Sequence, residues 1–129
     1  KAYRFRPNDF VTMGEFARMA VKGLEIPLSI TAAHFSDVPR GHPAFKYIET
    51  LYDYSTQSHE PFFHYEIHKE PGKNTRVLAR SDRKVTGAIA IEIVSGLMRK
   101  KIKGWHDPDA NLTRGEAVQL IYQHMASGK

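Results

Sequence analysis

The chain has 129 residues, of which 41% are hydrophobic, so it has the size of one domain and can fill a modest core. Its formal net charge of +5 favours an anionic partner, such as nucleic acid, a membrane surface or an acidic polysaccharide. The absence of cysteine excludes disulfides, a thiol nucleophile and a cysteine-type zinc site. No apolar run approaches the roughly 18 residues of a membrane span.

The first predicted helix begins at Thr12. Thr12 and Glu15 form a capping-box pattern, in which the hydroxyl accepts one orphan backbone N–H and the carboxylate reaches back for another. Apolar side chains then recur at helical spacing: Phe16, Ala17, Met19, Ala20 and Leu24. The pattern predicts a helix that ends between Gly23 and Pro27.

The middle of the chain predicts a second helix and a hairpin. Pro43 fits the first turn of a helix, and the apolar spacing predicts that this helix covers about 43–54. Residues 62–69 alternate as a strand does, 70–74 read as a turn, and 75–79 can return as the partner strand. We therefore expect a β-hairpin over about 62–79, inserted into a helical protein.

Two more helices are predicted after Thr86 and after Thr113. Thr86 lacks the capping carboxylate because Ile89 stands in its place, whereas Thr113 has Glu116. Pro108 precedes Thr113 by five positions, as a proline does before Thr12, and apolar residues follow all three threonines at shared offsets. The helix caps are thus predicted at Thr12, Glu15, Thr86, Thr113 and Glu116, in three copies of one unit.

Three stretches of the sequence resemble the S-layer homology (SLH) repeat. They read Phe5-Arg6-Pro7 through Thr12-x-x-Glu15-Phe16-Ala17, Phe35-Ser36-Asp37-Val38-Pro39 followed by His42-x-Ala44-x-x-Tyr47-Ile48-x-x-Leu51, and Pro108-x-x-x-Leu112-Thr113-Arg114-Gly115-Glu116-Ala117. The resemblance covers most of the chain apart from the hairpin region, and its most specific part is the tetrad at 113–116.

The resemblance implies a mainly α protein, an SLH-like pseudo-threefold helical bundle with the hairpin inserted, in a single domain over 1–129. The repeat portions would be about 1–27, 34–99 and 104–126. Because Thr86 and Thr113 are close in sequence, the third copy has room for one helix and a loop, so we expect its outer helix to be absent.

The resemblance also implies a function. SLH modules are non-catalytic parts of exported proteins at the bacterial cell surface or envelope, and grooves between their repeats bind anionic cell-wall polysaccharide or a peptidoglycan-associated polymer. The tetrad arginine grips acidic groups on the sugar, which suits a planar guanidinium. Arg114 alone matches that arginine, because Met13 and Gly87 occupy the other two places.

Three further residues are candidate sugar contacts. Trp105, the single tryptophan, can stack on a sugar ring, although such a side chain also serves as a partly buried packing residue. Asp37 and His42 lie at the turn before the second helix, where capping and turn chemistry are the alternative. Arg114 itself could instead be exposed and unpaired.

Other functions find less support in the sequence. His64, Glu66 and His68 share one strand face near His59, but alternate strand residues lie about 7 Å apart, which favours an exposed polar face over a metal site. We expect no cofactor, no nucleophile elbow and no phosphate loop, and hence no enzyme. Nucleic-acid binding would need a defined basic and aromatic platform, which the sequence does not indicate.

A second hypothesis is a scaffold subunit of an extracellular or envelope assembly. It would keep the SLH fold and use the hairpin to contact other proteins. Unpaired strand edges and apolar side chains suit such docking, and the candidate residues are Phe62, Phe63, Tyr65 and Ile67.

Overall fold

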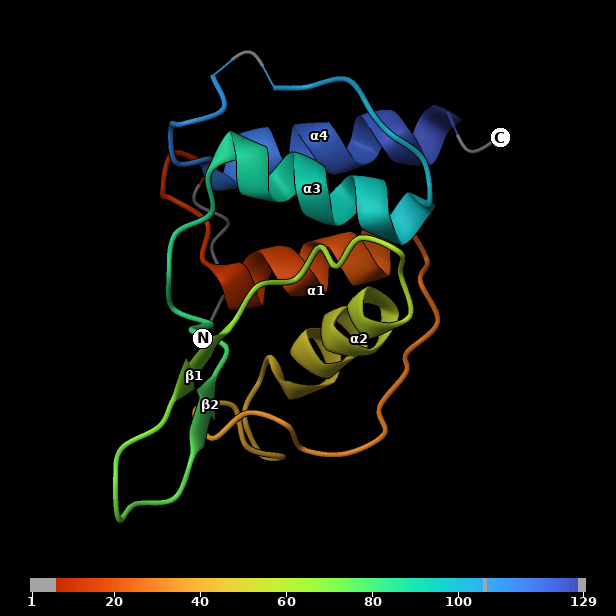
Figure 1. Ribbon diagram of the computed structural model, residues 1–129. Helices are drawn as coiled ribbons and strands as arrows, with labels where there is room; N and C mark the ends of the chain where they lie inside the picture. The colour runs from red at the N-terminus through yellow and green to blue at the C-terminus, as the bar shows by residue number, and fades with distance from the viewer. Residues whose placement is uncertain (1–6, 106, 128–129) are drawn as a thin grey trace.

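The computed structural model describes residues 7–105 and 107–127 (Figure 1). In these residues it has four helices, α1 (Met13–Gly23), α2 (Phe45–Thr56), α3 (Gly87–Met98) and α4 (Arg114–Ser127), and two strands, β1 (Glu66–His68) and β2 (Arg76–Leu78). The strands form one antiparallel hairpin in which Ile67 pairs with Val77. The predicted mainly helical chain with an inserted hairpin is therefore confirmed.

Three helices begin at the threonines that the sequence singles out. Thr12 Oγ1 accepts the amide of Glu15 at 3.3 Å, and Glu15 Oε1 accepts the amide of Thr12 at 3.0 Å. Thr113 and Glu116 make the same reciprocal pair, at 3.1 and 2.9 Å. Thr86 Oγ1 accepts the amide of Ile89 at 3.3 Å, and no carboxylate returns the bond because Ile89 is apolar.

The residues just before these threonines join in a closed ring of backbone hydrogen bonds. Val11 N–H donates to the carbonyl of Leu112 at 3.0 Å, Leu112 to Val85 at 2.7 Å, and Val85 to Val11 at 3.3 Å. All three side chains are buried. Segments that lie up to 101 positions apart in the sequence thus meet at one point in the core, where α1, α3 and α4 begin.

The same pattern continues into the first turn of each helix. The first two amides of each helix donate to carbonyls three and five positions before the threonine of the next copy, at 2.8–3.1 Å. The pairs are Met13 with Arg83, Gly14 with Ser81, Gly87 with Ala110, Ala88 with Pro108, Arg114 with Asp9, and Gly115 with Pro7. We name the three contacts the α1–α3, α3–α4 and α4–α1 junctions. Each junction satisfies amides that a helix start would otherwise leave unpaired.

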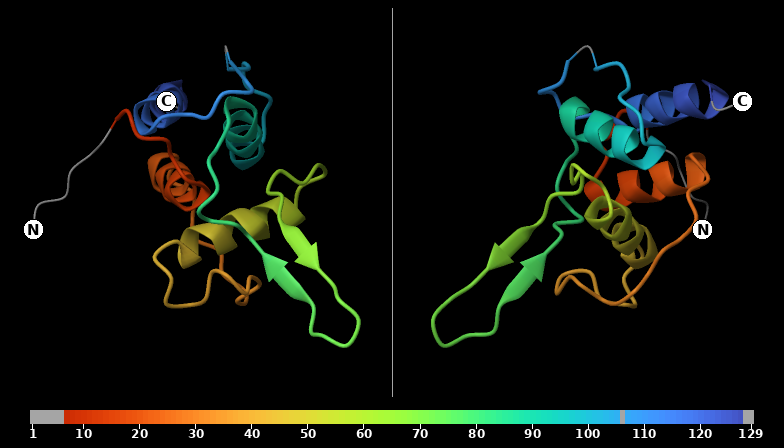
Figure 2. Two further views of the ribbon diagram at one scale, coloured as in Figure 1. Left: turned by 90° about the vertical axis from the view of Figure 1, so that its left-hand side faces the viewer. Right: turned by 45° about the vertical axis from the view of Figure 1, so that its right-hand side comes forward.

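Viewed along their axes, α1, α3 and α4 stand at the corners of a triangle, and α2 lies across α1 and α3 (Figure 2, left). The core fills the space between these helices and continues under the segment that follows α2. No helix in 7–105 or 107–127 combines the length and apolar character needed to cross a membrane.

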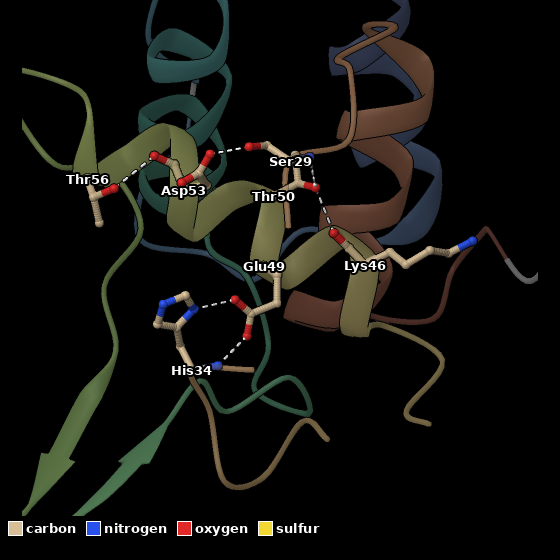
Figure 3. A network of polar contacts seen from close by, with 7 residues as sticks. All are labelled: Ser29, His34, Lys46, Glu49, Thr50, Asp53 and Thr56. Atoms are coloured by element: carbon tan, nitrogen blue, oxygen red, sulfur yellow. Dashed lines mark hydrogen bonds and ion pairs between the residues drawn. The ribbon is translucent and has the colours of Figure 1, made fainter. Parts of the chain in front are cut away.

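The connection from α1 to α2 is fixed by polar contacts with α2 (Figure 3). Ser29 N–H donates to Thr50 Oγ1 at 3.1 Å, and the Ser29 hydroxyl donates to Asp53. Glu49, which is 1% exposed, accepts the amide of His34 at 2.7 Å and holds its Nδ1 at 2.6 Å. A buried carboxylate needs such partners, so this network ties the connection to the helix.

The hairpin is shorter than the sequence predicts. Residues 62–65 do not join β1, because the amides of Phe62 and Phe63 both donate to the buried Ser55 hydroxyl, at 2.9 and 3.0 Å. Both rings point into the core, with 3% and 2% exposed. Phe62 lies against Gly96, where an added Cβ would approach Phe62 Cδ2 to 2.0 Å. The alternation predicted over 62–69 is therefore wrong at its start.

Candidate functional site

The α4–α1 junction carries the one arginine of the three equivalent positions. Arg114 is the first residue of α4, and its backbone amide donates to the carbonyl of Asp9 at 2.8 Å. Its guanidinium crosses the junction and forms an ion pair with Glu15, the capping carboxylate of α1. The side chains are 19% and 34% exposed, so the pair lies at the edge of the core with one side open to solvent. The alternative that Arg114 is exposed and unpaired is therefore wrong.

Glu15 holds two partners with its two oxygens. Oε1 closes the α1 capping box on Thr12, and Oε2 receives Arg114. Partial burial opposes ionisation, but the hydrogen bonds and charge of Arg114 and the Thr12 bonds outweigh it and lower the pKa of Glu15. The carboxylate is thus ionised at neutral pH, and it fixes the guanidinium of Arg114 at the junction.

The α1–α3 junction replaces this ion pair with apolar residues. Met13 occupies the position of Arg114 and Ile89 the position of Glu15, since each lies one and three residues after its threonine. Met13 is 0% exposed. Burial without a charge partner suits methionine and would be costly for arginine. This junction therefore has no guanidinium at the position of Arg114.

The α3–α4 junction contains Trp105. Gly87 stands at the arginine position, and a Cβ there would lie 2.8 Å from Trp105 Cδ1 and 2.9 Å from the carbonyl of Asp107. The indole fills the space that a side chain at 87 would occupy, and it is partly buried. Trp105 thus has the packing role that the sequence left as the alternative to sugar stacking, and it lies at a different junction from Arg114.

Asp37 and His42 also have structural partners. The Asp37 oxygens accept the amides of Ala79 and Arg80 at 2.9 and 2.8 Å, which anchors the chain after β2. His42 Nδ1 accepts the amide of Ala44 at 3.0 Å, just before α2. Ala44 in turn lies against Gly14, at the α1–α3 junction. Of the four residues predicted to bind sugar, Arg114 and Trp105 therefore lie at different junctions, and His42 contacts a residue next to the third.

The hairpin offers less apolar surface than predicted. Phe62 and Phe63 are buried, which corrects their assignment as docking residues, because a partner cannot reach them. Tyr65 and Ile67 are 37% and 56% exposed, so they remain available. Tyr65 also packs edge-to-face on Tyr52 at 5.7 Å between ring centroids.

The histidines of the hairpin region pair with separate carboxylates. His64 Nε2 lies 2.7 Å from Glu92 on α3, whereas His68 Nε2 lies 2.9 Å from Glu66, which also accepts Arg80. Among the described residues, no group of three or more acidic or histidine side chains could hold a metal ion.

Two polar side-chain contacts were not predicted from the sequence. The Arg114–Glu15 pair joins residues 99 positions apart, and only the register of the ring brings them together. The His34–Glu49 contact had a weak signal, because Glu49 lies on the apolar face of the predicted helix between Phe45 and Tyr52. A charged residue on such a face predicts a buried partner but does not identify it.

Comparison of the chain with known protein families, with curated proteins and with solved structures found no match.

Proposed function

We propose that the chain is a non-catalytic module with an SLH-like, pseudo-threefold fold, part of an exported protein at the bacterial cell surface or envelope. It binds an anionic cell-wall polysaccharide or a peptidoglycan-associated polymer at the α4–α1 junction. The observation that carries the proposal is the cyclic set of nine backbone hydrogen bonds among three helix starts, with one arginine retained across one junction.

The helix ends themselves cannot supply the anion site. The first amides of α4 donate to Asp9 and Pro7, and the amide of Glu116 donates to Thr113. We therefore assign the anion contact at this junction to the guanidinium of Arg114, which is 19% exposed. A sugar carboxylate would share or replace Glu15 on that guanidinium, through the paired hydrogen bonds that arginine makes with carboxylates.

Binding of purified cell-wall polysaccharide tests the proposal. Arg114→Gln removes the charge and keeps a polar side chain, and we expect at least tenfold weaker binding by isothermal titration calorimetry. Arg18→Gln is the matched control, because Arg18 is exposed on α1 and lies outside the junction contacts. Polysaccharide with its carboxyl groups reduced should bind both proteins equally weakly. Unchanged affinity of Arg114→Gln would remove this junction from the account.

A second candidate function is protein docking through the hairpin, as a scaffold subunit. It is supported by the exposure of Tyr65 and Ile67 and by the fact that both strands of the two-stranded sheet are edges. The hairpin extends away from the helices (Figure 1).

Substitution on the hairpin tests this second function. Ile67→Asp should abolish co-purification with the other subunits of an envelope assembly, whereas Thr75→Asp, exposed and outside the strands, should not. An assembly that stays intact with Ile67→Asp would contradict it.

A further inference from the structure

The two outer edges of the hairpin differ in what covers them. On the β2 side, the carbonyl of Val77 accepts the amide of Ser36 at 2.8 Å, and Asp37 accepts the amide of Ala79 at 2.9 Å. The segment that precedes α2 therefore occupies the outer edge of β2. A strand from a partner could not add to this edge without displacing these contacts.

The outer edge of β1 is open. In an antiparallel pair, the N–H and C=O of one residue point to the same side of the strand. The carbonyl of Val77 points to Ser36 and away from β1, so its partner Ile67 points its own N–H and C=O away from β2. In the part of the chain that the structure describes, no group hydrogen-bonds to this N–H or C=O, and the Ile67 side chain is 56% exposed. Figures 1 and 2 show no described segment along this side of β1.

The sequence around Ile67 is complementary to itself. Residues 64–70 read His64-Tyr65-Glu66-Ile67-His68-Lys69-Glu70. If two copies of this strand run antiparallel with Ile67 opposite Ile67, each Glu66 lies opposite His68 of the second copy. Each His64 likewise lies opposite Glu70 of the second copy. Acidic side chains thus face histidines on both sides of a central apolar pair, and such cross-strand pairs stabilise a sheet.

The neighbouring registers lack this complementarity. Because outward-pointing backbone groups must meet outward-pointing groups, the two strands can slide only by two residues at a time. A slide in one direction places Glu66 opposite Glu66. A slide in the other direction places Glu66 opposite Glu70 and His68 opposite His68. Like charges directly opposite each other destabilise a sheet, so the residue pattern favours the one register with Ile67 opposite itself.

From these observations we propose that two copies of this chain pair through β1, antiparallel, with Ile67 on a two-fold axis. The N–H of each Ile67 donates to the C=O of the other, and the two hairpins form one four-stranded sheet. The proposal rests on the second candidate function, protein docking through the hairpin, and names a second copy as the partner.

Cysteine cross-linking tests the pairing directly, because the chain has no cysteine of its own. Opposite residues of a hydrogen-bonded antiparallel pair lie about 5.5 Å apart between Cα atoms, a distance that a disulfide spans. Ile67→Cys should therefore give mostly covalent dimer under mild oxidation. Thr75→Cys is the matched control, since Thr75 is exposed on the same hairpin but outside both strands, and it should stay mostly monomeric. Equal dimer yields from the two variants would overturn the proposal.

An exchange of charges tests the register in sedimentation experiments. The wild type should form a dimer whose fraction rises with concentration. His68→Glu places an acid opposite Glu66, and Glu66→Lys places a cation opposite His68, so each variant alone should dimerise at least fivefold more weakly. An equal mixture of the two should recover the dimer, because each variant then faces complementary charges. A variant that had merely lost its hairpin would not be rescued in this way, and an absence of recovery would overturn the register.

The same measurements separate self-pairing from docking in general. A wild-type chain that stays monomeric at all concentrations would overturn the proposal. If Ile67→Asp nevertheless abolished co-purification with other subunits, docking through the hairpin would stand with a different protein as the partner. A dimer of the wild type that Ile67→Cys fails to trap would show that the two copies meet at another surface, which would also overturn it.

Discussion

α1 and α4 begin alike and end with opposite surfaces. Both start at a threonine with a complete capping box, both follow a buried residue of the backbone ring, and both donate their first amides to the next copy. Yet Ala17 and Val21 of α1 are buried, whereas Val118 and Tyr122 of α4 are largely exposed. The repeat pattern places a residue on a face, but its neighbours decide whether that face is covered.

The junctions differ in the same manner. The backbone contacts are equivalent at all three, while the side chains at the arginine position are Arg114, the buried Met13 and the absent side chain of Gly87. The backbone hydrogen bonds form whichever of these residues is present. The side chains can therefore differ among the junctions while the backbone contacts stay the same. The residue at the arginine position can thus differ among the junctions without loss of the fold.

The largest expected difference between α1 and α4 is the loss of stability when a charge is introduced at equivalent positions. Ala17→Asp places a carboxylate in the core without a partner, and we expect a loss of about 4 kcal/mol in the free energy of unfolding. Val118→Asp, the equivalent change on α4, should cost less than about 0.5 kcal/mol. Urea titration followed by circular dichroism measures both. Similar losses would show that the two faces are not covered differently.

The α1–α3 junction can be converted toward the α4–α1 junction. Met13→Arg buries a charge opposite Ile89, and we expect a loss of about 3 kcal/mol. Adding Ile89→Glu supplies the partner that Glu15 gives Arg114, and it should restore at least about 1 kcal/mol in a double-mutant cycle. Additive effects of the two substitutions would show that these positions do not face each other.

α3 and α1 can be compared ten residues after their threonines. Gly96→Ala would place a Cβ against the ring of Phe62, and such overpacking costs about 2 kcal/mol. Lys22→Ala, at the same offset on exposed α1 surface, should change stability by less than about 0.5 kcal/mol. Thermal unfolding of both variants measures these losses. A Gly96→Ala variant as stable as the wild type would mean that Phe62 does not pack against position 96.

The smallest expected effect concerns pH. Because the pKa of Glu15 is lowered in the folded chain, its contribution is complete above the ordinary glutamate pKa of about 4.3 and is lost as pH falls through the folded value. Glu15→Gln should therefore lose less stability than the wild type between pH 6 and 3, by less than about 1 kcal/mol. Glu60→Gln, on exposed surface, should follow the wild type. If the stability of Glu15→Gln fell with pH as steeply as that of the wild type, the Arg114–Glu15 ion pair would be contradicted.

The sequence predicted those parts of the fold that depend on near neighbours. The capping pairs at Thr12 and Thr113 and the apolar spacing after Thr86 are local signals, and α1, α3 and α4 start at these residues. The hairpin was likewise predicted, because its turn and its two strands are adjacent in sequence. Local signals could not predict the ring of backbone hydrogen bonds, because it joins residues from three segments that are distant in sequence.

The candidate site was predicted less well, for the same reason. Arg114 is visible in the sequence, but its partner Glu15 already has a local role as a cap, so nothing marked it as an ion-pair partner. Phe63, Tyr65 and Ile67 alternate with polar residues, which suggested a strand that starts at Phe62. Instead, the Ser55 hydroxyl accepts the amides of Phe62 and Phe63, and Gly96 leaves room for the ring of Phe62. Such choices are made by tertiary contacts, which outweigh the local pattern.

Arg114 is the proposed anion-binding group, and Glu15 holds it across the α4–α1 junction. The most direct test is a calorimetric titration of purified cell-wall polysaccharide into the wild type and Glu15→Gln. Glutamine retains a capping side chain but releases the guanidinium from its carboxylate, so Glu15→Gln should bind at least threefold more tightly. Unchanged or weaker binding by Glu15→Gln would contradict the claim.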